Sequence, residues 1–255
     1  MSTAPIDHGV PAEGCGRDLP TPARALAIGA HPDDIEFGCG ATLAKWAAAG
    51  AEVSHLVCTD GSKGTWDPRQ DTAQLVVTRR DEQRAAAKAV GGRGEVVFLG
   101  WTDGELASDL RQRWEVAYWI RRLRPDVVLG HDPWRRYRLH PDHRHAGFLA
   151  VDGVVAARDP LFFPEQNLPH YRPSALLLFE ADEPDHVEDV TGYRDAKLAA
   201  LFAHESQYRS TMHIEPDDDG TQRQAFVARI RDRLAASGAL IGVTQGEAFK
   251  AILEL

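Results

Sequence analysis

The chain has 255 residues, of which 43% are hydrophobic and 26% are charged, and these values exclude collagen, a long coiled coil and wholesale disorder. A chain of this length buries a large core on folding and needs no disulfide or structural metal. Its 29 lysines and arginines against 38 aspartates and glutamates give a net charge of −9, which argues against a nucleic-acid-binding protein.

The cysteines and the N-terminal residues indicate where in the cell the protein is expected to lie. Cys15, Cys39 and Cys58 stand far apart without a CxxC pair, so they indicate neither a disulfide framework nor a zinc knuckle. The first residues lack the basic and apolar segments of a signal peptide, and no apolar run approaches the ~18 residues of a membrane helix. We therefore expect a cytoplasmic protein without a membrane span.

The pattern along the chain alternates between short apolar runs and helical periodicity. Residues 1–22 contain four prolines and three glycines without periodicity, and predict a flexible N-terminal arm. The elements that follow are predicted as strand 24–30, helix 40–49, strand 52–58, helix 72–90, strand 95–99, a helix with Ser108 as N-cap, strand 126–130, helix 141–157, strand 175–179, helices 193–203 and 222–237, and a last strand over 248–253.

Four strand–helix alternations in about 135 residues predict parallel strands with right-handed crossovers. The expected fold class is therefore α/β, a Rossmann-like three-layer sandwich with a mostly parallel central sheet. No composition shift divides the sequence after the arm, so we expect a single domain over 23–255.

The triplet His-Pro-Asp occurs twice in this pattern. His31-Pro-Asp-Asp34 follows the first predicted strand, and His140-Pro-Asp-His143 opens the helix after the fourth, where proline suits the first helical position. In the doubly wound strand order 3-2-1-4, strands one and four are neighbours at the switch point where ligands bind. The two turns, more than 100 residues apart in sequence, are therefore expected to face each other.

Such a pair of turns supplies two imidazoles and a carboxylate for a divalent cation, with further acids and bases beside it. Three protein ligands and a fourth position left to water are typical of a catalytic zinc site. The metal lowers the pKa of its water to about 7, and an aspartate that is not a ligand can take the proton. A single turn of this kind is more often a helix cap, but two of them on neighbouring strands favour the metal site.

The motifs, in this order between residues 26 and 207, resemble those of the PIG-L/LmbE-like metal-dependent de-N-acetylases. They are Ala30-His-Pro-Asp-Asp34 with Glu36, Gly38 and Gly40, then Arg79-x-x-Glu82, Asp103-Gly104, His140-Pro-Asp-His143 and, more weakly, His204-x-Ser206-Gln207. Ile35 follows the paired aspartates, where some members of the family carry a glutamate.

The resemblance implies a metal centre and a base. His31, Asp34 and His143 would bind zinc, with ferrous iron as the alternative native metal. Asp33 would be the general base that activates the metal-bound water.

The resemblance also implies roles for residues around the metal. His140 would stabilise the oxyanion and help to protonate the leaving amine, with Asp142 holding its orientation. Arg79 and Asp103 would contact the sugar. Homo-oligomers are common in the family, and we expect one here.

Aromatic and basic side chains flank the second turn. Trp66, Trp101 and Trp134 fall in loops after predicted strand ends, where they either stack on a sugar ring or pack locally. Some family members carry a mobile tyrosine two residues before the second turn. Arg138 occupies that position here, with Tyr137 beside it, so it stays open which of them assists the oxyanion.

Three other features have simpler interpretations. His131, at the end of the fourth strand, is expected to line the pocket without binding metal, and His55 to be an interior histidine. Gly38-Cys39-Gly40 lacks the third glycine of a dinucleotide-binding loop and lies too far from the strand end.

The leading hypothesis is a metal-dependent hydrolase that removes an N-acetyl or other N-acyl group from a small amino-sugar substrate such as an N-acetylglucosaminide. A second version uses the same site as an amidase on a thiol conjugate or another natural product. A nucleotide-binding Rossmann oxidoreductase whose two turns are only caps, and a non-catalytic metal- or sugar-binding module, are the alternatives from other classes.

Overall fold

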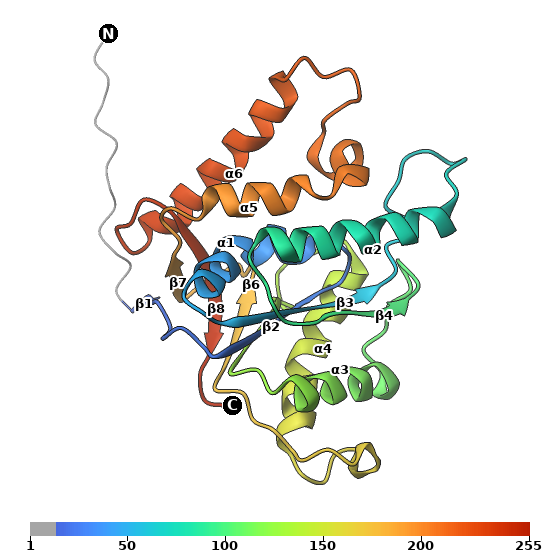
Figure 1. Ribbon diagram of the computed structural model, residues 1–255. Helices are drawn as coiled ribbons and strands as arrows, with labels where there is room; N and C mark the ends of the chain where they lie inside the picture. The colour runs from blue at the N-terminus through green and yellow to red at the C-terminus, as the bar shows by residue number, and fades with distance from the viewer. Residues whose placement is uncertain (1–13) are drawn as a thin grey trace.

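The computed structural model describes residues 14–255 (Figure 1). The strands are β1 (Gly16–Arg17), β2 (Arg24–Gly29), β3 (Glu52–Thr59), β4 (Val96–Trp101), β5 (Val127–His131), β6 (Ala175–Phe179), β7 (His186–Asp189) and β8 (Gly246–Ile252). The α-helices are α1 (Asp34–Ala48), α2 (Thr72–Ala89), α3 (Leu110–Leu123), α4 (Pro141–Arg158), α5 (Arg194–Phe202) and α6 (Thr221–Ala239). Short helical turns lie at η1 (Pro164–Gln166), η2 (Glu205–Gln207) and η3 (Tyr208–Met212).

The eight strands form one sheet in the order β1-β7-β8-β6-β5-β2-β3-β4. Neighbouring strands pair in parallel, except that β8 runs antiparallel to both β6 and β7. The run β4-β3-β2-β5 confirms the strand order 3-2-1-4 expected from the sequence. Because β2 and β5 pair directly, from Ala25 opposite Val127 to Ala27 opposite Leu129, their carboxyl ends lie side by side.

Helices cover both faces of the sheet. In Figure 1, α1, α2, α5 and α6 lie on one side, and α3 and α4 lie on the other. Side chains of β2 alternate between the two cores: Ala25 and Ala27 pack with α1 and α2, whereas Leu26 and Ile28 pack with α3 and α4. The predicted three-layer α/β arrangement is therefore confirmed. Within residues 14–255, no helix combines the length and the apolarity needed to cross a membrane.

Helix α1 begins at Asp34, earlier than the predicted start at Gly40, and is interrupted at Cys39 (φ −146°). The interruption frees backbone N–H groups in the next turn, and two of them donate to the carboxylate of Glu247 from β8, at 3.1 and 2.7 Å. The ammonium of Lys197 lies 2.5 Å from the same carboxylate. The sequence pattern detected only the part after the break because the first part carries acidic and glycine residues instead of apolar periodicity.

The start of α3 and the N-terminal arm also differ from expectation. Asp109, not Ser108, occupies the N-cap of α3, and the Ser108 hydroxyl lies 3.0 Å from Nδ1 of His145. Of the expected arm 1–22, residues 1–13 lie outside the described part of the chain, but β1 pairs in parallel with β7. Asp18 secures this pairing, because its carboxylate accepts hydrogen bonds from Asp189 N (2.8 Å) and Lys45 Nζ (2.6 Å). Strands of two and four residues are too short to show a hydrophobic period.

Candidate metal and catalytic site

The two His-Pro-Asp turns meet at the carboxyl edge of the sheet, as the strand order predicts. His31 follows β2, while His140 caps the N-terminus of α4 and His143 lies in its first turn. The imidazole centroid of His31 is 4.6 Å from that of His140 and 5.1 Å from that of His143. Two stretches of chain that are distant in sequence therefore form one cluster.

The three side chains expected to bind metal converge within this cluster. Nδ1 of His31 lies 3.2 Å from Nε2 of His143, and each of these nitrogens lies 3.3 Å from an oxygen of Asp34. Two imidazole nitrogens and a carboxylate oxygen are the ligand types of catalytic zinc sites. This set therefore fits a divalent metal ion.

The nitrogen of His31 that points away from this set faces two carboxylates. Its Nε2 lies 3.1 Å from Asp142 Oδ2 and 3.2 Å from Asp103 Oδ1. Asp142 is itself fixed by the backbone N–H groups of Gly104 (2.6 Å) and Leu106 (3.2 Å). Metal-binding histidines usually donate their second N–H to such a carboxylate, which orients the ring.

Two residues to which the resemblance gives other roles also contact His31. The carboxylate of Asp142, expected to orient His140, and that of Asp103, expected to contact the sugar, both face Nε2 of His31. The reason is that the loop after β4 brings residues 103–106 against the first turn of α4. Burial alone would lower the pKa of His31, but its contacts with Asp103, Asp142 and Asp34 raise that pKa well above the ordinary value.

His140 and His143 differ from His31 in their surroundings. His140 is exposed, and its Nδ1 accepts the backbone N–H of Asp142 at 3.3 Å. Burial lowers the pKa of His143 to about 4, which keeps its ring neutral, as a metal ligand must be. Arg138 Nη1 lies 2.8 Å from Nδ1 of His143, and the same guanidinium forms an ion pair with Glu180.

Asp33, the expected base, lies at a strained position of the backbone. Its φ is 108°, whereas the seven other described non-glycine residues with positive φ lie between 48° and 60°. Conformations of this kind cost roughly 1–3 kcal/mol and cluster at functional sites. Burial raises the pKa of Asp33 to about 6, although Arg79, with Nη2 3.6 Å from Asp33 Oδ2, acts in the opposite direction. A carboxyl with a raised pKa has the character of a general base that works near neutral pH.

Arg79, which the resemblance implies as a sugar contact, is directed into the protein. It is only 2% exposed, and its guanidinium donates to the carbonyl oxygens of Gly61 (2.9 Å) and Pro32 (2.5 Å). Through these hydrogen bonds, Arg79 connects the loop after β3 to the first His-Pro-Asp turn.

Sequence reasoning missed a buried polar group behind Asp33. Gln83 accepts the backbone N–H of Asp33 at 3.0 Å and donates to Glu36 Oε1 at 2.7 Å. Glu36 also lies 3.3 Å from Nε2 of His204 and 3.4 Å from Nδ1 of His55, which is fully buried as expected. Burial alone would raise the pKa of Glu36, but His204 and His55 lower it to about 2. The one feature of the sequence that could have indicated this role is that Gln83 lies four residues after Arg79, which places both side chains on the same face of α2.

His131 supports the metal-binding set from the side of β5. Its ring is buried, with Nε2 3.3 Å from Asp34 Oδ2 and Nδ1 3.5 Å from Glu180 Oε2. In the described part of the chain, potential ligand atoms that all lie within 4.8 Å of one another occur in three overlapping groups: His31, His140 and His143; His31, Asp103, His140 and Asp142; and Asp34, His131 and His143. His131 therefore lies beside two of the expected ligands, Asp34 and His143.

The three loop tryptophans separate into two kinds. Trp66 and Trp134 are 75% and 60% exposed. Trp101 ends β4, its Nε1 donates to Glu115 at 2.8 Å, and the guanidinium of Arg111 lies 4.9 Å from its ring centroid. Trp101 therefore packs locally. Trp66 and Trp134 are largely exposed, and the ring of Trp134 also lies edge-to-face with Phe148, with centroids 5.9 Å apart.

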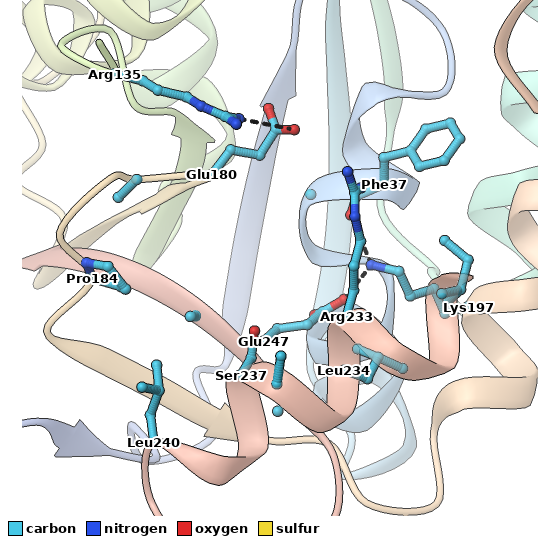
Figure 2. A pocket seen from close by; sticks show the side chains of 16 residues that line it. Phe37, Arg135, Glu180, Pro184, Lys197, Arg233, Leu234, Ser237, Leu240 and Glu247 are labelled. Atoms are coloured by element: carbon cyan, nitrogen blue, oxygen red, sulfur yellow. Dashed lines mark hydrogen bonds and ion pairs between the residues drawn. The ribbon is translucent and has the colours of Figure 1, made fainter. Parts of the chain in front are cut away.

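A separate hollow of about 420 Å³ adjoins this site on the side of α6 (Figure 2). Figure 2 shows Arg135 and Glu180 pointing toward each other on one wall, with an N–O distance of 3.6 Å, and the Lys197–Glu247 pair on another. The residues lining the hollow include no histidine. Glu180 is shared by both regions, because it also lies beside His131.

The glycines near the first turn have a packing role. Gly38 and Gly40 lie within α1, and a Cβ on Gly38 would stand 2.6 Å from the ring of Phe179. Gly38 therefore allows α1 to approach β6, and the pair does not form a phosphate-binding loop of the kind that an oxidoreductase would need.

Comparison with known proteins gives a family match and several similar deacetylases. Residues 26–154 match the PIG-L family, described as GlcNAc-PI de-N-acetylase. A diacetylchitobiose deacetylase from Thermococcus kodakarensis is 35% identical over 188 residues, covering 72% of this chain and 70% of that protein. A 1D-myo-inositol 2-acetamido-2-deoxy-alpha-D-glucopyranoside deacetylase from Streptomyces avermitilis is 33% identical over 178 residues, or 60% of each chain.

A solved structure extends the similarity to the fold. The N,N'-diacetylchitobiose deacetylase from Pyrococcus horikoshii, complexed with its inhibitor MPG, superposes with a TM-score of 0.80 at 31% identity, covering 91% of this chain and 84% of that chain. Both His-Pro-Asp turns fall inside the region matched by the family. The chain therefore belongs to the PIG-L family of de-N-acetylases.

Proposed function

We propose that this protein is a metal-dependent hydrolase that removes the acetyl group, or another short acyl group, from the nitrogen of an amino sugar. The observation that carries the proposal is the convergence of His31, His143 and Asp34 within 3.3 Å of one another, next in sequence to the buried Asp33. The relatives from T. kodakarensis, P. horikoshii and S. avermitilis are all named for acetamido sugars, which supports an N-acetylglucosaminide as the substrate class.

His31, Asp34 and His143 would hold the metal ion, with zinc expected and ferrous iron as the alternative. When bound, a divalent cation supplies a Lewis acid that polarises the amide carbonyl and makes a water molecule acidic enough to attack near neutral pH. The carboxylates of Asp142 and Asp103 keep Nδ1 of His31 directed at this position, because they hold the opposite side of its ring.

The side chains around this position divide the proton transfers. Asp33 takes a proton from the attacking water, the water oxygen bonds to the acyl carbon, and the C–N bond breaks to give a carboxylic acid and a free amine. His140 is exposed beside His31 and His143, where its protonated imidazole stabilises the developing charge on the carbonyl oxygen and delivers a proton to the amine. Asp33 then releases the proton that it took to solvent, and His140 takes one up, so both groups return to their starting forms. Trp134, with its exposed ring in the loop before α4, offers a face for the sugar.

The test is acetate release by the purified protein loaded with zinc or iron(II). The substrates are N-acetylglucosamine, N,N'-diacetylchitobiose and an N-acetylglucosaminyl inositol, with an N-acetylated thiol conjugate and an N-acetyl amino acid as comparison amides. We expect release from at least one sugar, its loss after chelation and its return on adding metal. Release from none of the sugars by metal-loaded protein would overturn the proposal, and release from the thiol conjugate alone would move the substrate class away from plain sugars.

The Asp33→Asn variant tests the proposed base. It keeps the size of the side chain, so we expect metal content equal to that of the native protein and a loss of turnover of about 10²- to 10⁴-fold. Unchanged turnover would remove Asp33 from this role.

A further inference from the structure

The peptide unit between Pro32 and Asp33 is held at both of its polar ends by side chains from α2. Its carbonyl oxygen accepts a hydrogen bond from Arg79 Nη2 at 2.5 Å, and its N–H donates to Gln83 Oε1 at 3.0 Å. Arg79 and Gln83 are four residues apart on one helix, so they project from the same face. Both are buried, and Gln83 is fully inaccessible.

The orientation of the Gln83 amide is determined by its neighbours. The N–H of Asp33 requires an acceptor, so the amide oxygen must face it. The amide nitrogen then faces the Glu36 carboxylate at 2.7 Å and Nδ1 of His55 at 3.1 Å, where a donor is needed. Gln83 therefore connects the backbone of Asp33 to a buried polar group that holds the amide in one position.

Rotation of a peptide plane changes ψ of the residue before it and φ of the residue after it, while the path of the chain hardly moves. The 108° φ of Asp33 is the conformation that such a rotation would relieve. With the carbonyl held by Arg79 and the N–H held by Gln83, the plane cannot rotate without breaking both bonds.

We propose that Gln83 is a positioning residue for the base, and that with Arg79 it clamps the Pro32–Asp33 peptide so that Asp33 stays in its strained conformation. Its contribution to catalysis rests on the proposed role of Asp33. Gln83 neither touches the substrate nor contacts a proposed metal ligand through its side chain, so its removal affects the rate without weakening substrate or metal binding.

The test is Gln83→Met, which keeps the length of the side chain and removes its hydrogen bonds to Asp33, Glu36 and His55. We expect kcat to fall about 10- to 100-fold, with KM and zinc affinity each within about threefold of the native values, because only the placement of the base changes. Crystals of the variant should show a negative φ at residue 33.

Gln166→Met is the matched control. Gln166 is likewise buried and bridges two groups, accepting from Arg121 Nη1 at 2.9 Å and donating to the carbonyl oxygen of Trp114 at 2.8 Å, but it lies among α3, α4 and η1. We expect this variant to lose thermal stability and to keep the native kcat. A Gln83→Met enzyme with native kcat, or with φ of residue 33 still near 108°, would overturn the proposal.

A second pair of variants covers the case in which Gln83→Met does not fold. Gln83→Glu keeps the acceptor for Asp33 N–H but sets two carboxylates against each other, and adding Glu36→Gln restores a donor between them. We expect the double variant to regain at least about tenfold in kcat over Gln83→Glu, and no gain would contradict the clamp. If the native protein releases no acetate, the proposed function fails, whereas φ of residue 33 in the variant crystals still decides whether Gln83 holds the peptide.

Discussion

Replacing Asp142 with asparagine tests how the first histidine is oriented. In the native protein, the Asp142 carboxylate accepts the N–H groups of Gly104 and Leu106 and also faces Nε2 of His31 at 3.1 Å. An asparagine side chain has one oxygen, and the two backbone donors compete for it. Its NH₂ group is then directed at His31, which favours the ring tautomer with the proton on Nδ1, the nitrogen proposed to bind metal.

The expected loss of zinc affinity depends on which carboxylates still face the His31 ring in the variant. Loss of a carboxylate that orients a metal-binding histidine typically costs 10- to 100-fold in metal affinity, or about 1.4 to 2.7 kcal/mol. Asp103 still lies 3.2 Å from the same nitrogen, so we expect the lower end, about tenfold.

The assay is competition for zinc with a chromophoric chelator at neutral pH, and the control is Asp152→Asn. Asp152 lies on the same helix, but its 2.8 Å ion pair with Arg113 is half-exposed and far from the cluster. We expect native affinity for the control. A folded Asp142→Asn protein that binds zinc as tightly as the native protein would refute the assigned orientation of His31.

Arg138→Met should bind zinc about tenfold more tightly. A metal ion on Nε2 of His143 requires a proton on Nδ1, and in the native protein the Arg138 guanidinium, itself a donor, lies 2.8 Å from Nδ1. Equal or weaker zinc binding by the variant would contradict this reasoning. The Asp18 carboxylate has a pKa lowered by its hydrogen bonds despite its burial, so its stabilising effect is present above about pH 4 and is lost as the pH falls through the folded-state pKa. Urea unfolding of Asp18→Asn should show a loss of about 0.5–1 kcal/mol at pH 7 that shrinks as the pH falls below about 4, and a loss independent of pH would contradict the ion pairing. Gly38→Ala should lose about 1–3 kcal/mol in the same assay, while Gly40→Ala, whose Cβ meets its nearest atom at 3.4 Å, should not; equal losses would show that Gly38 is not a packing constraint.

The sequence was sufficient to predict that the two His-Pro-Asp turns lie together. Alternating strands and helices predict that the ends of β2 and β5 are adjacent, and this adjacency is what joins His31 to His143. The resemblance implied Asp34 as the third ligand, and its carboxylate oxygens lie 3.3 Å from the two imidazole nitrogens.

Contacts made by loops could not be predicted in the same way. The resemblance implied that Asp142 orients His140, but only the loop after β4 shows that its carboxylate also meets His31. The burial of Arg79 depends on how α2 packs over the first turn. Gln83 escaped notice because a neutral amide carries no titration or ligand signal, and its role is visible only once Asp33 N–H is seen to need an acceptor.

Zinc-edge anomalous diffraction from crystals of the zinc-loaded protein tests the central claim most directly. We predict one strong peak about 2.0–2.2 Å from His31 Nδ1, His143 Nε2 and an oxygen of Asp34, with Asp33 beside it but not bonded to it. A peak held by other residues, or none in this cluster under saturating zinc, would contradict the account.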